Sequence, residues 1–322
     1  MRSHFKLTVG LALGGGAARG ISHLGVIRAL EREQIPIDLI VGTSIGAIIG
    51  GAYAATRQVD ALEDKVRQVL SSEEFRTNRL SFLKETKKRR GGLFFSVTNL
   101  IRRGIIFGVS NLRPSFLSAE RFANSLAAIL PDVQIEDLQI PFGAVALDIH
   151  AATEVVLTRG RLRQAAAASS AIPGILPPVR MNGRKLIDGG WVDKIPVLPA
   201  FKLGADVVIA VDITKDLDSA RDYRRGVDIM VRANSIKDAT LVGFSRRMAD
   251  LVIEPDVGKI HWADFGDFEN CITRGDEAVT RAIPQIREVL RHERLLSIVR
   301  PGGRKRLAVR QLRHPDLRLC VE

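Results

Sequence analysis

Cysteine is scarce in this sequence, because only Cys271 and Cys320 occur among its 322 residues. Neither belongs to a Cys-x-x-Cys pair or a Cys/His cluster, which excludes a disulfide scaffold and disfavours structural zinc. Long apolar runs are also missing, and no stretch reaches the ~18 residues that a membrane-spanning helix needs. We therefore expect a cytoplasmic protein, either soluble or bound peripherally to the inner face of the membrane.

The N-terminus imitates a signal peptide only in part. Arg2 and Lys6 precede the apolar run at residues 7–13, but that run is short and continues into three glycines without a cleavage site. A buried first strand is the better interpretation of this segment.

Positive charge is concentrated in two segments rather than spread over the chain. The net charge is +12, yet residues 76–113 alone hold ten Lys or Arg and one Glu, and residues 294–322 hold eight against two acidic residues. The rest of the chain is close to neutral. We infer one main domain over residues 1–293, interrupted by a basic amphipathic insertion at about 72–118, and a basic C-terminal tail over residues 294–322.

Residues 84–109 of this insertion combine basic clusters with the apolar residues Phe94, Val97, Ile101 and Ile105 at helical spacing. Such a segment is typical of helices that lie on anionic membranes, and a buried flap or a solvated loop is the alternative. The basic segments lack the aromatic interleaving and the motifs of nucleic-acid-binding proteins, so no nucleic acid partner is expected.

Strands and helices alternate along most of the chain. Continuous apolar runs predict buried strands, and a 3.6-residue periodicity predicts helices. The expected strands are residues 7–13, 37–41, 142–149, 154–158, 179–181, 185–187 and 205–213, and the expected helices are residues 20–33, 47–55, 162–171 and 274–292. This alternation predicts a three-layer α/β/α domain with a mostly parallel central sheet.

The pentapeptide Gly42-Thr43-Ser44-Ile45-Gly46 lies between an expected strand and an expected helix. A Gly-x-Ser-x-Gly sequence in that position is typical of a nucleophile elbow, in which a tight turn exposes the serine hydroxyl above the sheet. Gly42 and Gly46 flank the turn, where larger side chains do not fit. Ser44 is therefore the candidate nucleophile, and a simple helix cap is the alternative.

A glycine-rich loop, GGGAARG at residues 14–20, follows the first expected strand. A P-loop would need Lys and Ser/Thr after the last glycine, and a dinucleotide fingerprint would need an acidic residue at the end of the next strand; both are missing. Backbone N–H donors for an oxyanion are the remaining explanation, with glycines in positive-φ conformations. Because adjacent parallel strands end at one edge of a sheet, we expect this loop beside Ser44.

A serine nucleophile needs a base, and Asp188 is the candidate. It follows an expected strand, and Gly189 and Gly190 after it allow close approach of the backbone. A carboxylate accepts the serine proton when both groups are held in contact away from water. A plain turn is the alternative interpretation. None of the six histidines lies in a recognisable motif, and His23 is interpreted as a packed or capping side chain.

Three motifs in this order, GGGAARG at 14–20, GTSIG at 42–46 and DGG at 188–190, resemble those of bacterial patatin-like phospholipases, a family of Ser–Asp acyl hydrolases. Other similar stretches extend the likeness from about residue 7 to residue 290. The resemblance implies that Ser44 is the nucleophile and Asp188 the proton acceptor. It also implies an oxyanion hole at the loop residues Gly14, Gly15, Gly16, Ala17 and Arg19.

The resemblance implies a serine esterase that hydrolyses acyl esters of lipids, as a phospholipase A or lysophospholipase does, through an acyl-enzyme and without metal or cofactor. The expected partners are a lipid or other acyl-ester substrate and an anionic membrane surface bound by residues 84–109. Two alternatives stay open: a Ser-His-Asp hydrolase, and a non-catalytic membrane-associated regulatory protein that retains the motifs. Lys194 departs from the family, which more often carries Asn there, and puts in doubt the hydrogen bonding of the loop after Asp188.

Overall fold

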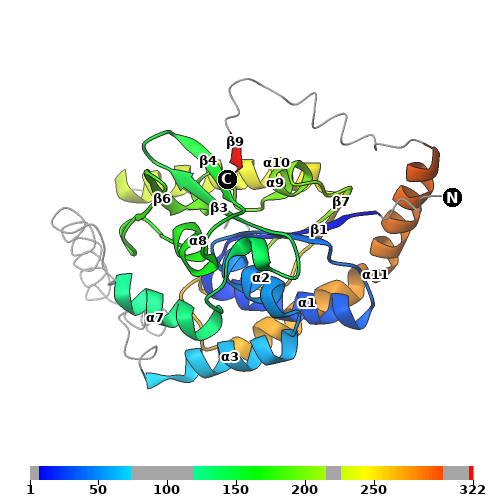
Figure 1. The fold of residues 1–322 in the computed structure, drawn as a ribbon, viewed down its shortest axis with the longest axis horizontal. Coiled ribbons are helices and arrows are strands. Elements are labelled where there is room, and N and C mark those ends of the chain that lie inside the picture. Colours follow the sequence, from blue (N-terminus) through cyan, green and yellow to red (C-terminus); the bar gives the residue numbers. More distant parts are fainter. Residues whose placement is uncertain (1–6, 74–118, 215–225, 300–318, 322) are drawn as a thin grey trace.

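The computed structural model describes residues 7–73, 119–214, 226–299 and 319–321 (Figure 1). Within these residues one nine-stranded sheet is flanked by helices. The strands are β1 (Val9–Leu13), β2 (Leu39–Thr43), β3 (Phe142–Asp148), β4 (Thr153–Leu157), β5 (Val179–Met181), β6 (Arg184–Asp188), β7 (Val207–Val211), β8 (Leu251–Ile253) and β9 (Leu319–Val321). The α-helices are α1 (Ser22–Arg32), α2 (Ile45–Thr56), α3 (Val59–Ser71), α7 (Ala119–Ile129), α8 (Leu162–Ser169), α9 (Val197–Lys202), α10 (Gly226–Met248) and α11 (Phe268–Val299). Short 3-10 turns are η1 (Ala17–Ile21), η3 (Ile135–Asp137) and η4 (Gly189–Trp191).

The sheet has the strand order β5-β6-β3-β2-β1-β7-β8, and β4 joins it by pairing with β3 and with β9. The central strands β3, β2, β1, β7 and β8 are all parallel to their neighbours in this order. The hairpin β5–β6 and strand β4 add the antiparallel pairs. The mostly parallel sheet expected from the alternation of strands and helices is confirmed.

Two hydrophobic cores lie on the two faces of the sheet, because successive side chains of a strand point to opposite faces. Leu11 and Leu13 of β1 belong to the larger core under α1, α2, α3 and α11, whereas Ala12 belongs to the smaller core with residues of α9 and α10. Figure 1 shows these two groups of helices on opposite sides of the sheet. The predicted three-layer α/β/α architecture is therefore confirmed.

The edge of β3 brings the ends of two distant strands together. Ala144 of β3 pairs with Gly42 of β2, and Val145 pairs with Thr43. The next residue, Ala146, pairs with Asp188 of β6. β4 pairs with one edge of β3 from Ala144 to Asp148. β2 and β6 therefore both pair with the other edge of β3, one after the other along its length. β2 is parallel to β3 and β6 is antiparallel, so the two strands meet at their carboxyl ends.

Some predicted features differ from the structure or fall outside it. The strand expected at residues 37–41 is β2, which begins at Leu39 and continues to Thr43, and no helix was expected where α3, α7 and α10 occur. The helix expected at 274–292 is the longer α11, which ends at Val299, beyond the expected start of the tail. Most of the insertion at 72–118, including residues 84–109, lies outside the described residues, so its proposed membrane role stays a prediction.

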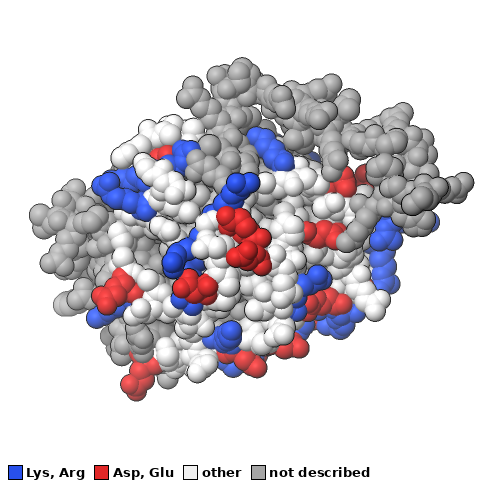
Figure 2. Space-filling view, viewed as in Figure 1, with Lys and Arg blue, Asp and Glu red and all other residues white. Residues whose placement is uncertain are grey.

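Within the described ranges, no helix is both long enough and apolar enough to cross a membrane. Basic and acidic side chains are interspersed over the coloured part of the face shown in Figure 2. This mixture agrees with the nearly neutral charge of the chain outside its two basic segments.

Candidate active site

Ser44 lies at a sharp turn between the end of β2 at Thr43 and the start of α2 at Ile45. Its φ of 56° and ψ of −121° are a conformation that costs a non-glycine residue of order 1–3 kcal/mol. The two flanking glycines make the turn possible. A Cβ atom on Gly42 would lie 2.3 Å from the carbonyl oxygen of Gly46, and one on Gly46 would lie 2.2 Å from that of Leu13. This geometry is that of a nucleophile elbow.

The hydroxyl of Ser44 contacts the carboxyl group of Asp188 directly. Ser44 Oγ donates a hydrogen bond of 2.7 Å to Asp188 Oδ2, although the two residues are 144 positions apart. Both residues are buried, with 8% of Ser44 and 5% of Asp188 exposed. The meeting of β2 and β6 along the edge of β3 explains how these two side chains come together.

The other oxygen of Asp188 is held by its own turn. Gly190 N–H donates a hydrogen bond of 2.7 Å to Asp188 Oδ1, and Asp188 caps the 3-10 turn Gly189–Trp191. A Cβ on Gly189 would lie 2.4 Å from the carbonyl oxygen of Val145, so glycine is required for β3 and this turn to pack so closely. With one oxygen held, the second is directed at Ser44.

Burial raises the pKa of Asp188 from its ordinary value of 3.8 to about 6, because desolvation disfavours the charged form. The hydrogen bonds from Ser44 and Gly190 and the charge of Lys194 act in the opposite direction and limit the rise. Asp188 is consequently ionised at neutral pH but has a higher proton affinity than an exposed aspartate. This combination suits a general base.

The glycine-rich loop lies beside Ser44. A Cβ placed on Gly15 would be 3.4 Å from Ser44 Cβ, which places the loop next to the elbow as expected for adjacent parallel strands. Gly14 N–H donates to the carbonyl of Val211, and Gly15 N–H donates to that of Lys194. These two N–H groups are therefore already used, contrary to the expectation that they bind an oxyanion.

The following residues of the loop differ in their backbone contacts. Ala18 N–H donates to Trp262 O, and Arg19 N–H makes a long bond of 3.4 Å to Gly16 O. Arg19 also donates from Nε to the carbonyl of Ile260, so its side chain braces a neighbouring loop. Among the described residues, no hydrogen bond uses the N–H of Gly16 or Ala17. The candidate oxyanion donors narrow to these two groups.

The expectation of positive-φ glycines in this loop is wrong. Gly16 has a φ of 175°, which is extended backbone, and the residue with positive φ is Ala17, at 51°. Glycine at position 16 is explained by space instead, because a Cβ there would lie 2.8 Å from Ile213 Cδ1. The loop packs tightly against Ile213, two residues after the end of β7.

Two buried side chains support the site, and neither role follows from the motifs. Ser169 Oγ, at the end of α8, accepts a hydrogen bond of 2.9 Å from Ser44 N–H and so fixes the elbow. His23 Nε2 lies 2.8 Å from Gly14 O and donates to it, since a carbonyl oxygen only accepts. Burial lowers the pKa of His23 to about 4, so it is neutral and holds the glycine loop in place.

The loop after Asp188 joins the elbow, the glycine loop and α10. Thr43 Oγ1 donates to the carbonyl of Asp193, and the carbonyl of Lys194 accepts from Gly15 N–H. The side chain of Lys194 donates a hydrogen bond of 2.7 Å to Asp238 of α10. The presence of lysine at position 194 does not affect the contact with the glycine loop, because the backbone carbonyl makes that contact. The lysine side chain adds an ion pair with Asp238.

Among the described residues, no hydrogen bond joins a histidine to the hydroxyl of Ser44. His23 is bonded to Gly14, and His261 Nδ1 accepts from Ala263 N–H within its own loop. His292 is an exposed residue of α11. The described residues also contain no group of three or more His, Cys, Asp or Glu side chains that could hold a metal ion.

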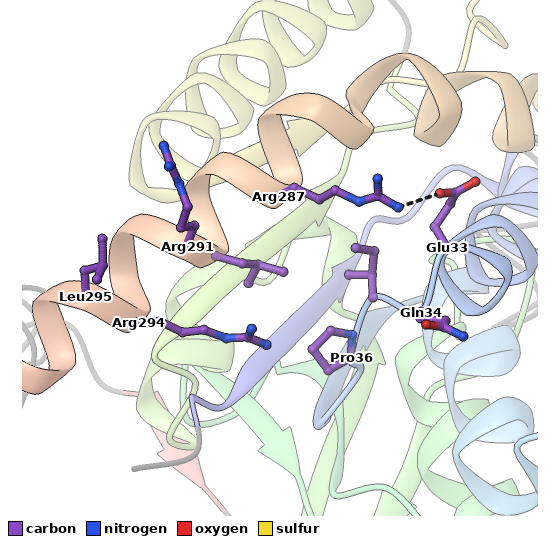
Figure 3. A pocket seen from close by; sticks show the side chains of 9 residues that line it. Glu33, Gln34, Pro36, Arg287, Arg291, Arg294 and Leu295 are labelled. Carbon is purple, nitrogen blue, oxygen red and sulfur yellow. Dashed lines mark hydrogen bonds and ion pairs between the residues drawn. The ribbon is translucent and has the colours of Figure 1, made fainter. Parts of the chain in front are cut away.

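A separate pocket lies away from this site, between α11 and the segment that joins α1 to β2 (Figure 3). It is lined mainly by basic and apolar side chains: Arg287, Arg291, Arg294, Leu290, Leu295, Ile35, Pro36, Gln34 and Glu33. Arg287 forms an ion pair of 3.0 Å with Glu33 across it. The pocket precedes β2 in the chain, whereas Ser44 follows β2, so the two are at opposite ends of that strand.

Comparisons with known proteins found a matching family model and several relatives. A family model described as patatin-like phospholipase matches residues 11–201. A lysophospholipase, NTE1 of Kluyveromyces lactis, is 33% identical over 205 residues, and patatin-like phospholipase domain-containing protein 6 of Homo sapiens is 35% identical over 208 residues. Each match covers 64% of this chain but only 12–13% of the relative. Among solved structures, VipD of Legionella pneumophila aligns with a TM-score of 0.42 at 14% identity, covering 87% of this chain and 67% of VipD.

Proposed function

Since this chain belongs to the patatin-like phospholipase family, we propose that it is a serine esterase that hydrolyses acyl esters of phospholipids or lysophospholipids through Ser44 and Asp188. The observation that carries this proposal is the hydrogen bond of 2.7 Å from Ser44 Oγ to Asp188 Oδ2 at a strained elbow. A buried hydroxyl in contact with a buried carboxylate is the minimal arrangement for nucleophilic catalysis with a general base.

The proposed reaction has two steps, acylation of Ser44 and hydrolysis of the acyl-enzyme. In the first, Ser44 Oγ attacks the acyl carbonyl carbon while Asp188 accepts the hydroxyl proton, and the oxyanion receives hydrogen bonds from the N–H groups of Gly16 and Ala17. The intermediate collapses to an acyl-enzyme as Asp188 returns the proton to the leaving alcohol. In the second step, a water oxygen attacks the acyl carbon while Asp188 accepts the water proton. The bond from the acyl carbon to Ser44 Oγ then breaks, Asp188 returns the proton to Oγ, and the fatty acid leaves. Water and the ester are the only reactants in this scheme, and Asp188 carries each proton.

The names of the relatives support a lipid substrate, because the family model is a phospholipase model and several relatives are named lysophospholipase. The chain matches only about an eighth of their length, so the head group and acyl position are questions for experiment. A location on the cytoplasmic face of a membrane is part of the same proposal.

The proposal is tested by incubating the protein with a mixed panel of diacylphospholipids, lysophospholipids and acylglycerols and identifying the products by mass spectrometry. We expect free fatty acid and the matching deacylated lipid from at least one class. Ser44→Ala protein is the control for contaminating lipases. Equal product from the two proteins, or none from either on every lipid class, would contradict the proposal.

The pH dependence of the reaction reports on Asp188. We expect kcat/KM for a neutral ester to rise with pH and level off above an apparent pKa of about 6, because only ionised Asp188 accepts the serine proton. The measurement is a rate profile between about pH 4.5 and pH 8 in buffers of constant ionic strength. A profile that is flat over this range would mean that Asp188 is not the base. The same conclusion would follow if the fall in rate at low pH disappeared when one histidine is replaced.

Gly16→Ala tests the oxyanion donors. The added Cβ would lie 2.8 Å from Ile213 Cδ1, so the loop must shift and tilt the N–H groups of Gly16 and Ala17. We expect kcat to fall by about 10²-fold with little change in KM, because the interaction is made mainly in the transition state. Gly258→Ala is a matched control, since no heavy atom lies within 4 Å of a Cβ at that position. Unchanged kcat in Gly16→Ala would show that other groups bind the oxyanion.

A further inference from the structure

Helix α10 exposes an unusual number of large apolar side chains. Ile236, Leu241 and Phe244 are 46%, 39% and 55% exposed, and Ile229 and Met230 near its start are 52% and 68% exposed. Exposed apolar residues are common one at a time, but a contiguous set marks an interaction surface.

These side chains form a stripe on the outer face of the helix. Ile229, Ile236 and Phe244 follow one another at intervals of two helical turns, and Met230 and Leu241 lie beside them. From Ile229 to Phe244 the stripe is about 22 Å long, at 1.5 Å per residue. Toward the C-terminal end of α10 the opposite side packs on the protein, where Val242 is buried in the core and Ser245 Oγ contacts Asp193, whereas Val231 near the start of the helix is 59% exposed on that side. The stripe is therefore not the face that holds the helix in the fold.

The charged residues next to the stripe are basic. Arg247 lies over the ring of Phe244 with its Cζ 4.7 Å from the ring centre, and helical geometry places Lys237 beside Ile236 and Leu241 on the same face. Asp238 lies on the inner side, where Lys194 binds its Oδ2 at 2.7 Å, and its Oδ1 lies 3.6 Å from Lys237 Nζ, so this carboxylate is shared between two lysines. Asp228 also lies off the stripe by its position in the helix. The outer face of α10 thus combines apolar residues with positive charge.

This face continues to the segment that carries the catalytic aspartate. Trp191, three residues after Asp188, is 43% exposed, and Lys237 Nζ lies 5.6 Å from the centre of its ring. The ion pair between Lys194 and Asp238 fixes α10 to the same segment. We call the surface formed by Trp191 and the outer residues of α10 the α10–Trp191 face.

We propose that the α10–Trp191 face binds the anionic surface of a phospholipid bilayer, an inference that rests on the proposed function and names where the enzyme meets its lipid. Apolar side chains and a tryptophan enter the interface between head groups and acyl chains, while Lys237 and Arg247 contact lipid phosphates. Charge favours this partner over a second copy of the chain. In a twofold dimer the same basic face would meet itself, whereas anionic head groups complement it.

The test is co-sedimentation with vesicles of phosphatidylglycerol or of phosphatidylcholine, using the full chain with Ser44→Ala so that the lipid is not consumed. In this background Ile236→Gln with Phe244→Gln removes apolar area, and Lys237→Gln with Arg247→Gln removes charge. Leu295→Gln is the matched control, because Leu295 is 58% exposed on α11, a different helix. Circular dichroism and gel filtration establish that each variant is folded and what its oligomeric state is.

We expect binding to phosphatidylglycerol that weakens about tenfold or more in the Ile236/Phe244 variant, since each side chain removes apolar area from the interface. The Lys237/Arg247 variant should lose the preference for phosphatidylglycerol over phosphatidylcholine. The Leu295→Gln protein should bind like its parent.

Three results would overturn the proposal. The first is binding by the Ile236/Phe244 variant equal to that of the Leu295→Gln control, which would place membrane contact elsewhere, such as residues 84–109. The second is no binding to either vesicle, and the third is a dimer that dissociates in the variant while vesicle binding is unchanged. Because the assay uses inactive protein, its failure is distinct from a failure of the proposed esterase activity, which the lipid panel measures.

Discussion

Ser44→Ala is expected to abolish ester hydrolysis and to prevent covalent labelling by a fluorophosphonate. Both outcomes need the Ser44 oxygen, which forms the acyl-enzyme in one case and the phosphonyl ester in the other. Removing a nucleophile of this kind typically leaves only the residual rate that oriented binding and the oxyanion donors supply. Turnover of a chromogenic ester and the mass of the labelled protein measure the two effects.

The fold should survive this change, because an alanine in place of Ser44 keeps the Cβ and the backbone N–H that donates to Ser169 Oγ. A thermal unfolding curve close to that of the wild type would establish that the loss is chemical. Peptide mapping of the wild-type protein should find the label on Ser44. A label on Ser169 or another serine, or labelling that persists in Ser44→Ala, would overturn the assignment.

Asp188→Asn is expected to lower kcat by about 10²–10⁴-fold, because an amide cannot accept the serine proton. The shape of the side chain is kept, and the asparagine oxygen can still accept the hydrogen bond from Gly190 N–H. KM for a short-chain ester should change little, since Asp188 contacts Ser44 rather than the acyl chain. Steady-state kinetics at about pH 8, where Asp188 of the wild type is ionised, measure the effect.

The same substitution should make the protein more stable above pH 6. A carboxyl group whose pKa is about 6 in the folded chain and 3.8 when solvated binds its proton more tightly in the native state, so the free energy of unfolding falls as pH rises between these values. The difference corresponds to about 3 kcal/mol at neutral pH, a loss that the uncharged asparagine side chain does not suffer. We expect a higher melting temperature for Asp188→Asn at pH 8 and no such gain at pH 4.

A different result would separate the open alternatives. Full activity in Asp188→Asn, with loss of activity when one histidine is replaced, would favour a Ser-His-Asp hydrolase. His23 is the histidine to replace first, because its side chain forms a hydrogen bond with Gly14 of the glycine loop. Inactivity of the wild-type protein on every ester, with intact membrane binding, would favour a regulatory protein that retains the motifs.

The sheet and the elbow at Ser44 follow from local patterns in the sequence, whereas Asp188 is expected as the partner of Ser44 only through the family resemblance that the three motifs carry together. Continuous apolar strands must be buried on both faces, and a glycine-flanked serine between a strand and a helix fits few structures other than an elbow. The contact of Ser169 with Ser44 N–H does not follow, because it joins a hydroxyl to a backbone group 125 residues away. It depends on where α8 packs, which no local pattern specifies.

The glycine loop and α10 show two other limits of sequence patterns. The N–H groups of Gly14 and Gly15 are used by Val211 and Lys194, so their role depends on which segments lie next to β1. Hydrophobic periodicity does not predict how helix α10 packs, because its apolar stripe faces outward and part of its inner face is polar. Hydrophobic spacing indicates a helix but does not say which side is buried.

The meeting of β2 and β6 on the edge of β3 also determines which insertions and deletions the site tolerates. Thr43, just before Ser44, pairs with Val145 of β3, and Asp188 pairs with Ala146, so β3 aligns the two side chains whatever the length of chain between them. Loops in that interval can therefore grow or shrink during evolution without changing the distance between the two side chains. Deleting a single residue within β6 has the opposite effect, because it rotates Asp188 to the other face of the sheet. The hairpin β5–β6 is accordingly the segment whose length must stay constant in descendants and in engineered chimaeras that keep this chemistry.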